Sequence, residues 1–140
     1  VGASTITDAA SFEVTGNPTA GTNATLTRTW AARLQGNVRF GGGQTVNRTA
    51  TAVSYTALFS DFYIGVTSTA AARTITLPAA ATVLTGKMFV IKDESGAAAT
   101  NNITIDGNAS ETIDGATTKL INTNYGSVTL VCDGSNWFIV

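Results

Sequence analysis

The stretch GSVTLVCDGSNWFIV, residues 126–140, decides the fold class of this chain. Val128, Leu130 and Cys132 recur at every second position, so their side chains share one face of a β-strand. The Asp-Gly pair in residues 133–136 is a turn signal that suits a positive φ. The apolar run Trp137–Val140 then predicts a second short strand, with Trp137 in the core. The end of the chain therefore indicates β-structure interrupted by a tight turn.

The same pattern extends back to about residue 52. Turn glycines at positions 86, 96, 107, 115, 126 and 134 have the spacing of short strands in a sandwich or barrel. Pro78–Leu84 is expected to be the one short helical piece, and the chain beyond Gly86 a meander. We expect strands at Ala52–Phe59, Phe62–Val66, Thr74–Leu77 and Lys87–Lys92, the last buried on both faces. The sequence predicts an all-β fold, a short-strand β-sandwich or a β-prism-like tip domain.

The first 50 residues are looser in pattern. Gly16–Asn23 predicts a long turn or loop, and Gly41–Gly43 a flexible joint. Thr25–Leu34 alternates as a long strand would, although a short helix at Trp30–Leu34 is an alternative. We therefore predict a shaft-like, turn-rich β segment over residues 1–50 and a β-rich terminal domain over residues 51–140. Because the sequence begins without Met or a signal segment, we expect a processed chain or a piece of a longer one.

The composition excludes several classes of function. The chain has no histidine. This excludes catalytic pairs in which an imidazole acts as the base, and it excludes metal sites with imidazole ligands. Its net charge of −1, with lysines and arginines dispersed singly, gives no basic surface for nucleic acid or an anionic membrane. The lone Cys132 leaves no intrachain disulfide and is expected to be a buried, inert thiol.

Low charge is the most informative number in the composition. Charged residues make up 12% of the chain, against about 25% in a typical globular domain. Either the 25 threonines and other neutral polar residues cover the surface, or much of the surface is not exposed. Both possibilities fit a subunit of a tight assembly.

The carboxylates do not form a catalytic pattern. A glycosidase needs two carboxyl groups about 5 to 10 Å apart, and the nearest candidates are Asp93 with Glu94 and Glu111 with Asp114. Turn and strand-end roles are favoured for them, because four of the six aspartates, at positions 93, 106, 114 and 133, lie at Asp-Gly or similar turns. Residues 106–111 lack the ligand spacing of an EF-hand calcium loop. We predict no catalytic residue, metal or cofactor.

Aromatic residues outside the core are the candidates for contacts with a partner. Tyr125 falls in the polar turn formed by residues 122–126 and is a better surface candidate than Trp137. Asn122 and Asn124 precede it in the same turn and carry side-chain amides, and Trp30 is a further candidate in the shaft-like segment. These four residues, Tyr125, Asn122, Asn124 and Trp30, are the predicted receptor-binding residues.

Several segments, taken in order, carry a resemblance to a known class of proteins. They are SDFYIGV (residues 60–66), RTITLP (73–78), GKMFVIKD (86–93), NNITI (101–105), TIDG (112–115) and GSVTLVCDGSNW (126–137). Together they resemble the small β-rich terminal domains of tailed-bacteriophage tail fibres and head fibres. The resemblance implies an intertwined homotrimer in the virion, and no shared catalytic motif.

Composition and resemblance together predict a non-enzymatic virion fibre or spike that presents a receptor-binding tip to a host surface polysaccharide or protein. Its expected partners are two further copies and other virion proteins. One alternative is a head fibre, capsid decoration or adaptor with no receptor role. A third reading is a fragment of a polysaccharide-degrading tailspike, although such enzymes usually need a long β-helical body.

Overall fold

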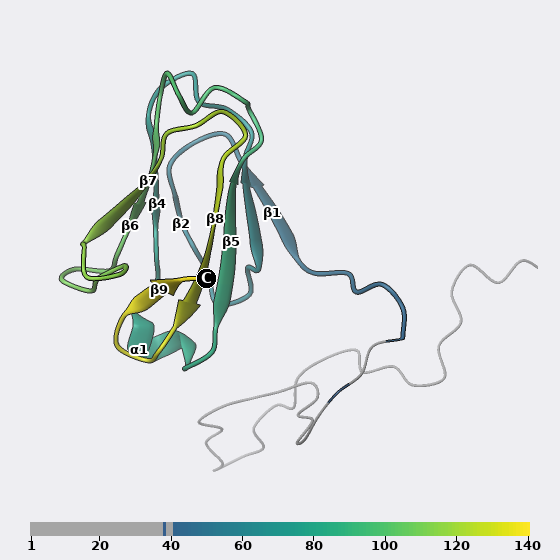
Figure 1. The fold of residues 1–140 in the computed structure, drawn as a ribbon, viewed down its shortest axis with the longest axis vertical. Coiled ribbons are helices and arrows are strands. Elements are labelled where there is room, and N and C mark those ends of the chain that lie inside the picture. Colours follow the sequence, from purple (N-terminus) through teal and green to yellow (C-terminus); the bar gives the residue numbers. More distant parts are fainter. Residues whose placement is uncertain (1–37, 39–40) are drawn as a thin grey trace, which may run out of the picture. The chain divides into compact units, whose positions relative to one another are not determined.

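A computed structural model describes residue 38 and residues 41–140, and its compact domain spans Gln44–Val140. Two mixed β-sheets face each other, with one short helix, α1 (Ala80–Val83), at one end (Figure 1). The five-stranded sheet has the order β1 (Arg48–Thr51), β3 (Tyr63–Val66), β5 (Met88–Asp93), β8 (Ser127–Cys132), β9 (Trp137–Ile139). The four-stranded sheet has the order β2 (Tyr55–Thr56), β4 (Arg73–Thr76), β6 (Ile103–Asp106), β7 (Thr118–Ile121). The predicted all-β fold is confirmed.

The predicted features of the first 37 residues, including Trp30 and the Thr25–Leu34 strand or helix, lie outside the described residues. The boundary between a shaft and a tip at residue 50 stays a prediction. In the part of the chain that the structure describes, no helix is long and apolar enough to cross a bilayer.

The chain crosses from one sheet to the other after each of its first five strands. As a result β1, β3 and β5 pair in parallel in one sheet, and β2, β4 and β6 pair in parallel in the other. Only β7, β8 and β9 reverse direction and pair antiparallel. The expected meander beyond Gly86 is therefore wrong, because β5 and β6 lie in different sheets. Strand alternation and turn spacing do not reveal which sheet a strand joins.

The core fills the space between the two sheets. Ile64, Phe89 and Leu130 point inward from the five-stranded sheet, and Ile75 and Ile105 from the four-stranded sheet, all fully buried. The Trp137 ring is also fully buried and lies 5.4 Å from the ring of Phe89. Trp137 and Cys132 are core residues as predicted, and burial is the main reason that the pKa of the Cys132 thiol is raised.

Most of the predicted elements between residues 60 and 93 are present. β3, β4, β5 and α1 confirm four of them. β5, however, alternates between buried and half-buried side chains, so the expectation of a strand buried on both faces is wrong. Its second face is an outer face of the sandwich, which the two described sheets leave uncovered.

The predicted strand Ala52–Phe59 is reduced to the two residues of β2. Side chains bend the backbone on both sides of it: the Thr51 hydroxyl donates to the carbonyl of Val53 at 2.9 Å, and the Leu58 N–H donates to the Asp61 carboxylate at 2.8 Å. The buried Asp61 carboxylate also accepts the hydroxyls of Thr49 and Tyr55, at 2.5 and 2.9 Å. Asp61 thereby joins the first two strands to the start of β3.

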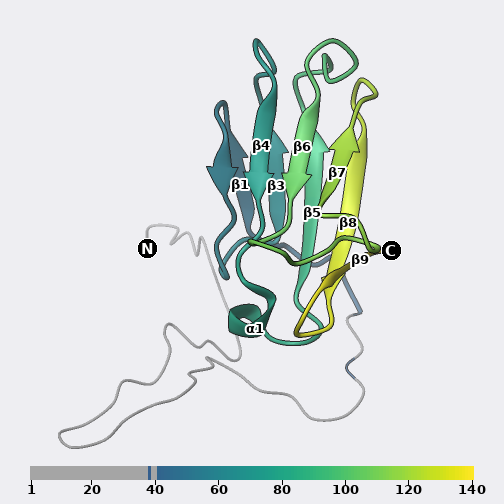
Figure 2. The ribbon, with the colours of Figure 1, turned by 90° about the vertical axis from the view of Figure 1, so that its left-hand side faces the viewer.

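Four loops lie together at one end of the domain. Because β1, β3 and β5 are parallel, the segments that follow them, residues 52–54, 67–72 and 94–102, leave the same end of the five-stranded sheet. Residues 122–126, between β7 and β8, join them there. We call these four segments the distal loops. Figure 2 shows them at the end opposite to α1.

Candidate functional site

Tyr125 is an exposed aromatic residue in the distal loops, with 63% of its surface accessible. Its φ of +59° lies in the left-handed region, which costs a non-glycine residue about 1 to 2 kcal/mol. The following Gly126 does not take the positive φ. Such a conformation persists only where neighbouring groups hold it, so the contacts of Tyr125 are decisive.

Three groups hold Tyr125 in place. Its N–H donates to Oδ2 of Asp93 at 3.0 Å, and its carbonyl accepts a hydrogen bond from Nζ of Lys92. The same ammonium lies 5.8 Å from the centre of the tyrosine ring. The ring packs against Gly96, where a Cβ atom would be only 2.2 Å from Cζ of Tyr125. Gly96 therefore leaves the space that the ring occupies.

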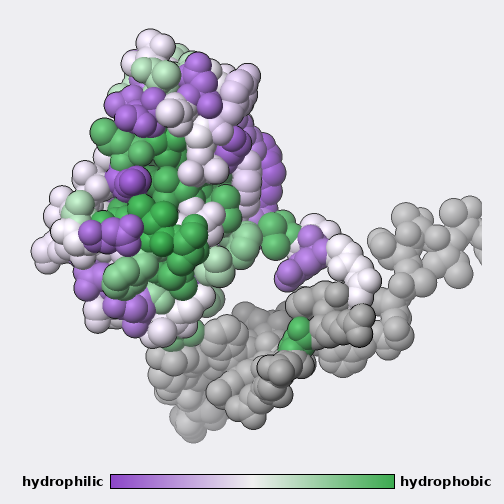
Figure 3. All heavy atoms as spheres, viewed as in Figure 1, coloured by the Kyte–Doolittle hydropathy of each residue, from purple (hydrophilic) through white to green (hydrophobic). Residues whose placement is uncertain are grey.

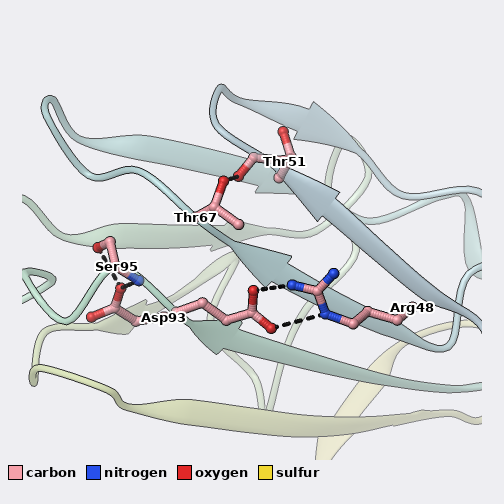
Figure 4. Close-up of polar contacts among 6 residues, drawn as sticks. Arg48, Thr51, Thr67, Asp93 and Ser95 are labelled. Atoms are coloured by element: carbon pink, nitrogen blue, oxygen red, sulfur yellow. Dashed lines mark hydrogen bonds and ion pairs between the residues drawn. The ribbon is translucent and has the colours of Figure 1, made fainter.

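Asp93, at the end of β5, organises two of the distal loops although it is fully buried. Its Oδ1 accepts from the N–H groups of Ser95 and Gly96, at 2.9 and 3.0 Å, and from the Ser95 hydroxyl (Figure 4). Its Oδ2 accepts from the N–H groups of Ala98 and Tyr125. Burial raises the pKa of Asp93, but the hydrogen bonds outweigh it, and the pKa is lowered.

Further hydrogen bonds join the remaining distal loops. The hydroxyls of Thr69 and Ser95 are 2.7 Å apart, and the Ala99 N–H donates to Oδ1 of Asn124 at 3.0 Å. The Thr67 hydroxyl donates to the Thr51 carbonyl at 3.1 Å, which fixes the start of residues 67–72 to the end of β1 (Figure 4). The loops 67–72, 94–102 and 122–126 are consequently one hydrogen-bonded unit.

Three of the four predicted receptor-binding residues lie in this unit. Asn122, Asn124 and Tyr125 are all exposed in the loop 122–126. The Asn124 carbonyl oxygen is already bonded to Ala99, so its NH₂ group is the part that can meet a partner. The fourth, Trp30, lies outside the described residues.

An ion pair joins β1 to Glu94, the first residue of the distal loop 94–102, and no sequence pattern predicts it. The Arg48 guanidinium donates two hydrogen bonds to the Glu94 carboxylate (Figure 4). One runs from Nε to Oε1 at 3.1 Å, and the other from Nη2 to Oε2. The hydrogen bond from Arg48 is the largest cause of the lowered pKa of Glu94, and a further hydrogen bond from Tyr63 acts in the same direction. Gly65 makes room for this carboxylate, since a Cβ there would lie 2.4 Å from it.

The carboxylates considered for hydrolysis are engaged in structural contacts. Asp93 and Glu94 have the partners described above. Both carboxylate oxygens of Glu111 accept from the Ala80 N–H at the start of α1, at 2.9 and 3.0 Å. Asp114 accepts from the Ile139 N–H at 3.2 Å and so fastens β9. Within residues 41–140, no three cysteine, histidine or acidic side chains gather in a way that could hold a metal ion.

Comparison with known families decides the relationship of this chain. The family described as "Bacteriophage T4 gp9/10-like protein, N-terminal" matches residues 17–138. The chain belongs to this family. A search of the curated proteins finds no match. As a gp9/10-like protein, the chain is a structural fibre or spike component of a bacteriophage virion, which confirms both the resemblance and the predicted location.

Proposed function

We propose that this gp9/10-like chain forms the host-facing tip of a homotrimeric fibre or spike, and that the distal loops around Tyr125 contact the receptor. The observation that carries the proposal is the conformation of Tyr125, which is exposed at a positive φ and held by Asp93, Lys92 and Gly96. An unfavourable backbone conformation that neighbours hold in place is typical of functional sites.

The chemistry of the loop 122–126 suits a sugar or a polar protein surface. The Tyr125 ring offers an apolar face and a hydroxyl, and Asn122 and Asn124 offer amide groups. The hydrogen bonds of Asp93 hold two of the distal loops in one conformation before any partner binds. Loops that are already ordered lose little conformational entropy on binding, which favours contact with a partner. A host surface polysaccharide and a host surface protein are the two receptor classes to test.

The proposed role is non-enzymatic. The four carboxylates closest to a hydrolase pattern each bind backbone amides or Arg48, which explains their presence without catalysis. Release of reducing ends from host capsule, lost in the Glu111→Gln variant, would instead support the tailspike reading.

The experiment that tests the proposal is adsorption of the labelled full chain to host cells. Tyr125→Ala should reduce adsorption at least about tenfold, as expected for an aromatic residue at the centre of a contact surface. Leu120→Ala is the control, because Leu120 is 45% exposed but lies on β7 outside the distal loops.

Equal adsorption of the wild type and Tyr125→Ala would contradict the proposed contact surface. Binding to purified capsids without adsorption to any host cell would support the alternative role as a head fibre, capsid decoration or adaptor. Glycosidase treatment of the cells distinguishes the receptor classes, since it abolishes adsorption only when the receptor is a polysaccharide.

A further inference from the structure

The two outer faces of the sandwich differ in chemistry. Side chains that point outward from the four-stranded sheet alternate with its buried isoleucines and are mostly hydroxyl-bearing: Thr56, Thr74, Thr76, Thr104, Asp106 and Thr118. Leu120 is the one large apolar side chain on this face among the described strands. We call this surface of the four-stranded sheet the threonine face, and its hydroxyls suit direct contact with water.

The outer face of the five-stranded sheet carries a cluster of apolar side chains. We call the residues Met88, Val90, Val131, Phe138 and Val140 the outer apolar patch. The first four alternate with buried residues of β5, β8 or β9, and Val140 follows the partly buried Ile139 at the end of β9. Phe138 and Val140 are 44% and 67% exposed. Figure 3 shows hydrophobic residues gathered along the edge of the sandwich at which β8 and β9 lie.

Strand register makes the outer apolar patch continuous. Met88 is the cross-strand partner of Val131, and Val131 is the partner of Phe138. Such partners have Cβ atoms about 4.5 to 5.5 Å apart, within van der Waals reach of each other's side chains. One pair further along, Thr129 lies opposite Val90, and the backbone carbonyl of Thr129 accepts a hydrogen bond from the Val140 N–H at 3.1 Å.

Charge indicates what can cover the patch. None of its five side chains is charged, and the charged side chains on the same outer face already have partners within the chain: Arg48 with Glu94, and Lys92 with the Tyr125 carbonyl. An uncharged apolar face is complementary to another face of the same kind. Three identical patches can therefore meet around a three-fold axis without placing charged side chains opposite one another, whereas the threonine face would leave its hydroxyls without water.

We propose that the outer apolar patch is the surface through which copies of this chain contact one another. The inference rests on the proposed homotrimer and adds to it which face is buried between copies. The threonine face then lies on the outside of the assembly, and the distal loops remain accessible at the end of each copy.

The test compares two matched substitutions in the full chain. Phe138→Lys places a charge in the patch, and Leu120→Lys places the same charge at an equally exposed apolar position on the opposite sheet. Masses are measured by sedimentation equilibrium at micromolar protein. We expect the wild type and Leu120→Lys to have the mass of three chains, and Phe138→Lys the mass of one, with far-UV circular dichroism unchanged.

A labelling experiment in the assembled protein guards against misfolding of the lysine variant. The thiols of Phe138→Cys and Leu120→Cys should react equally with a maleimide if neither face is covered. We expect labelling at position 138 to be at least about tenfold slower, because the interface must open first. The native Cys132 is buried and does not compete.

The outcomes separate the two proposals. A trimeric Phe138→Lys variant, with equal labelling rates at both positions, would overturn the assignment of the face and leave the homotrimer intact. If only Leu120→Lys dissociated the trimer, the contact between copies would lie on the four-stranded sheet, and the assignment of the interface to the outer apolar patch would be overturned. A wild type that is monomeric at micromolar concentration would overturn the homotrimer and the assignment together.

Discussion

The backbone N–H of Tyr125 donates to the buried carboxylate of Asp93, so the exposed aromatic residue of the distal loops depends on a buried side chain at the end of β5. Asp93→Asn keeps the shape of the side chain but replaces one acceptor oxygen with an NH₂ group. This NH₂ group would face backbone N–H donors and could not accept their hydrogen bonds. We expect the free energy of unfolding to fall by about 2 to 4 kcal/mol, measured by urea denaturation at fixed protein concentration.

Asp106→Asn is the control for this loss, because Asp106 is half-buried on the outer face of the four-stranded sheet. Its free energy of unfolding should stay within about 0.5 kcal/mol of the wild type. A comparable loss in both variants would show that Asp93 has no special role in the distal loops.

Stability should fall in acid, partly through Asp93. Its pKa in the folded chain is lowered, so as the pH falls below about 4 the unfolded chain takes up the proton first. The stabilisation is complete above the unfolded pKa and is lost as the pH falls through the folded pKa. Glu94, whose pKa is lowered chiefly by its hydrogen bond from Arg48, acts in the same direction. Urea midpoints recorded from neutral to acid pH should decline less steeply for Asp93→Asn than for the wild type.

Gly96→Ala should damage receptor contact more than stability. The φ of +73° at Gly96 makes alanine strained by about 1 to 2 kcal/mol, and the new Cβ would displace the Tyr125 ring. Gly86→Ala is a matched control: Gly86 has a φ of +86°, and a Cβ there meets nothing within 4 Å. Similar stability losses but reduced host-cell adsorption only in Gly96→Ala would confirm the role of the ring position. Equal adsorption of the two variants would contradict it.

The pair of Arg48 and Glu94 should contribute little to stability. Its side chains are 52% and 22% exposed, and solvent screens the attraction between exposed charges. A double-mutant cycle with Arg48→Gln and Glu94→Gln measures the coupling, which should shrink further in molar salt. A coupling that is large and insensitive to salt would show that the pair is covered in the assembled protein.

Trp137 should be essential to the fold. Its fully buried ring contacts Phe89, so Trp137→Ala is expected to lower the free energy of unfolding by about 3 to 5 kcal/mol. Val53→Ala, at a position that is 61% exposed, should change it by less than about 0.5 kcal/mol.

Deletion of residues 137–140 removes β9 as well and should abolish both folding and assembly. A stable trimer after this deletion would contradict the role of β9.

Much of the second half of the fold could be predicted from local patterns. β4 and most of β8 alternate polar and apolar residues, β5 begins with the apolar run Met88–Ile91, and the turns beside β5 and β8 contain Gly or Asp. The exposure of Tyr125 followed from its place between asparagines and glycine. β1 was not predicted, because Arg48–Thr51 contains no large apolar side chain to reveal a buried face. Its place in the sheet depends on pairing with β3 and on the buried Asp61.

Contacts between distant segments account for what the sequence could not reveal about the site. Asp93 and Tyr125 are 32 positions apart, and Arg48 and Glu94 are 46 apart. Each contact depends on which strands are neighbours, and that order arises from crossings between sheets that no local pattern records. A turn role for Asp93 was expected, but its second carboxylate oxygen serves a different loop.

Because the chain crosses between the two sheets, the register of neighbouring parallel strands does not depend on how many residues connect them. The step along the chain from Arg48 to its partner Tyr63 is little more than half the step from Tyr63 to its partner Val90, yet all three residues lie in one row of the sheet. Lengthening a flexible loop costs only about 0.6 kcal/mol for each doubling. The scaffold can therefore accept new distal loops of different size and sequence, and with them new receptors, while its core and the faces of its sheets stay unchanged.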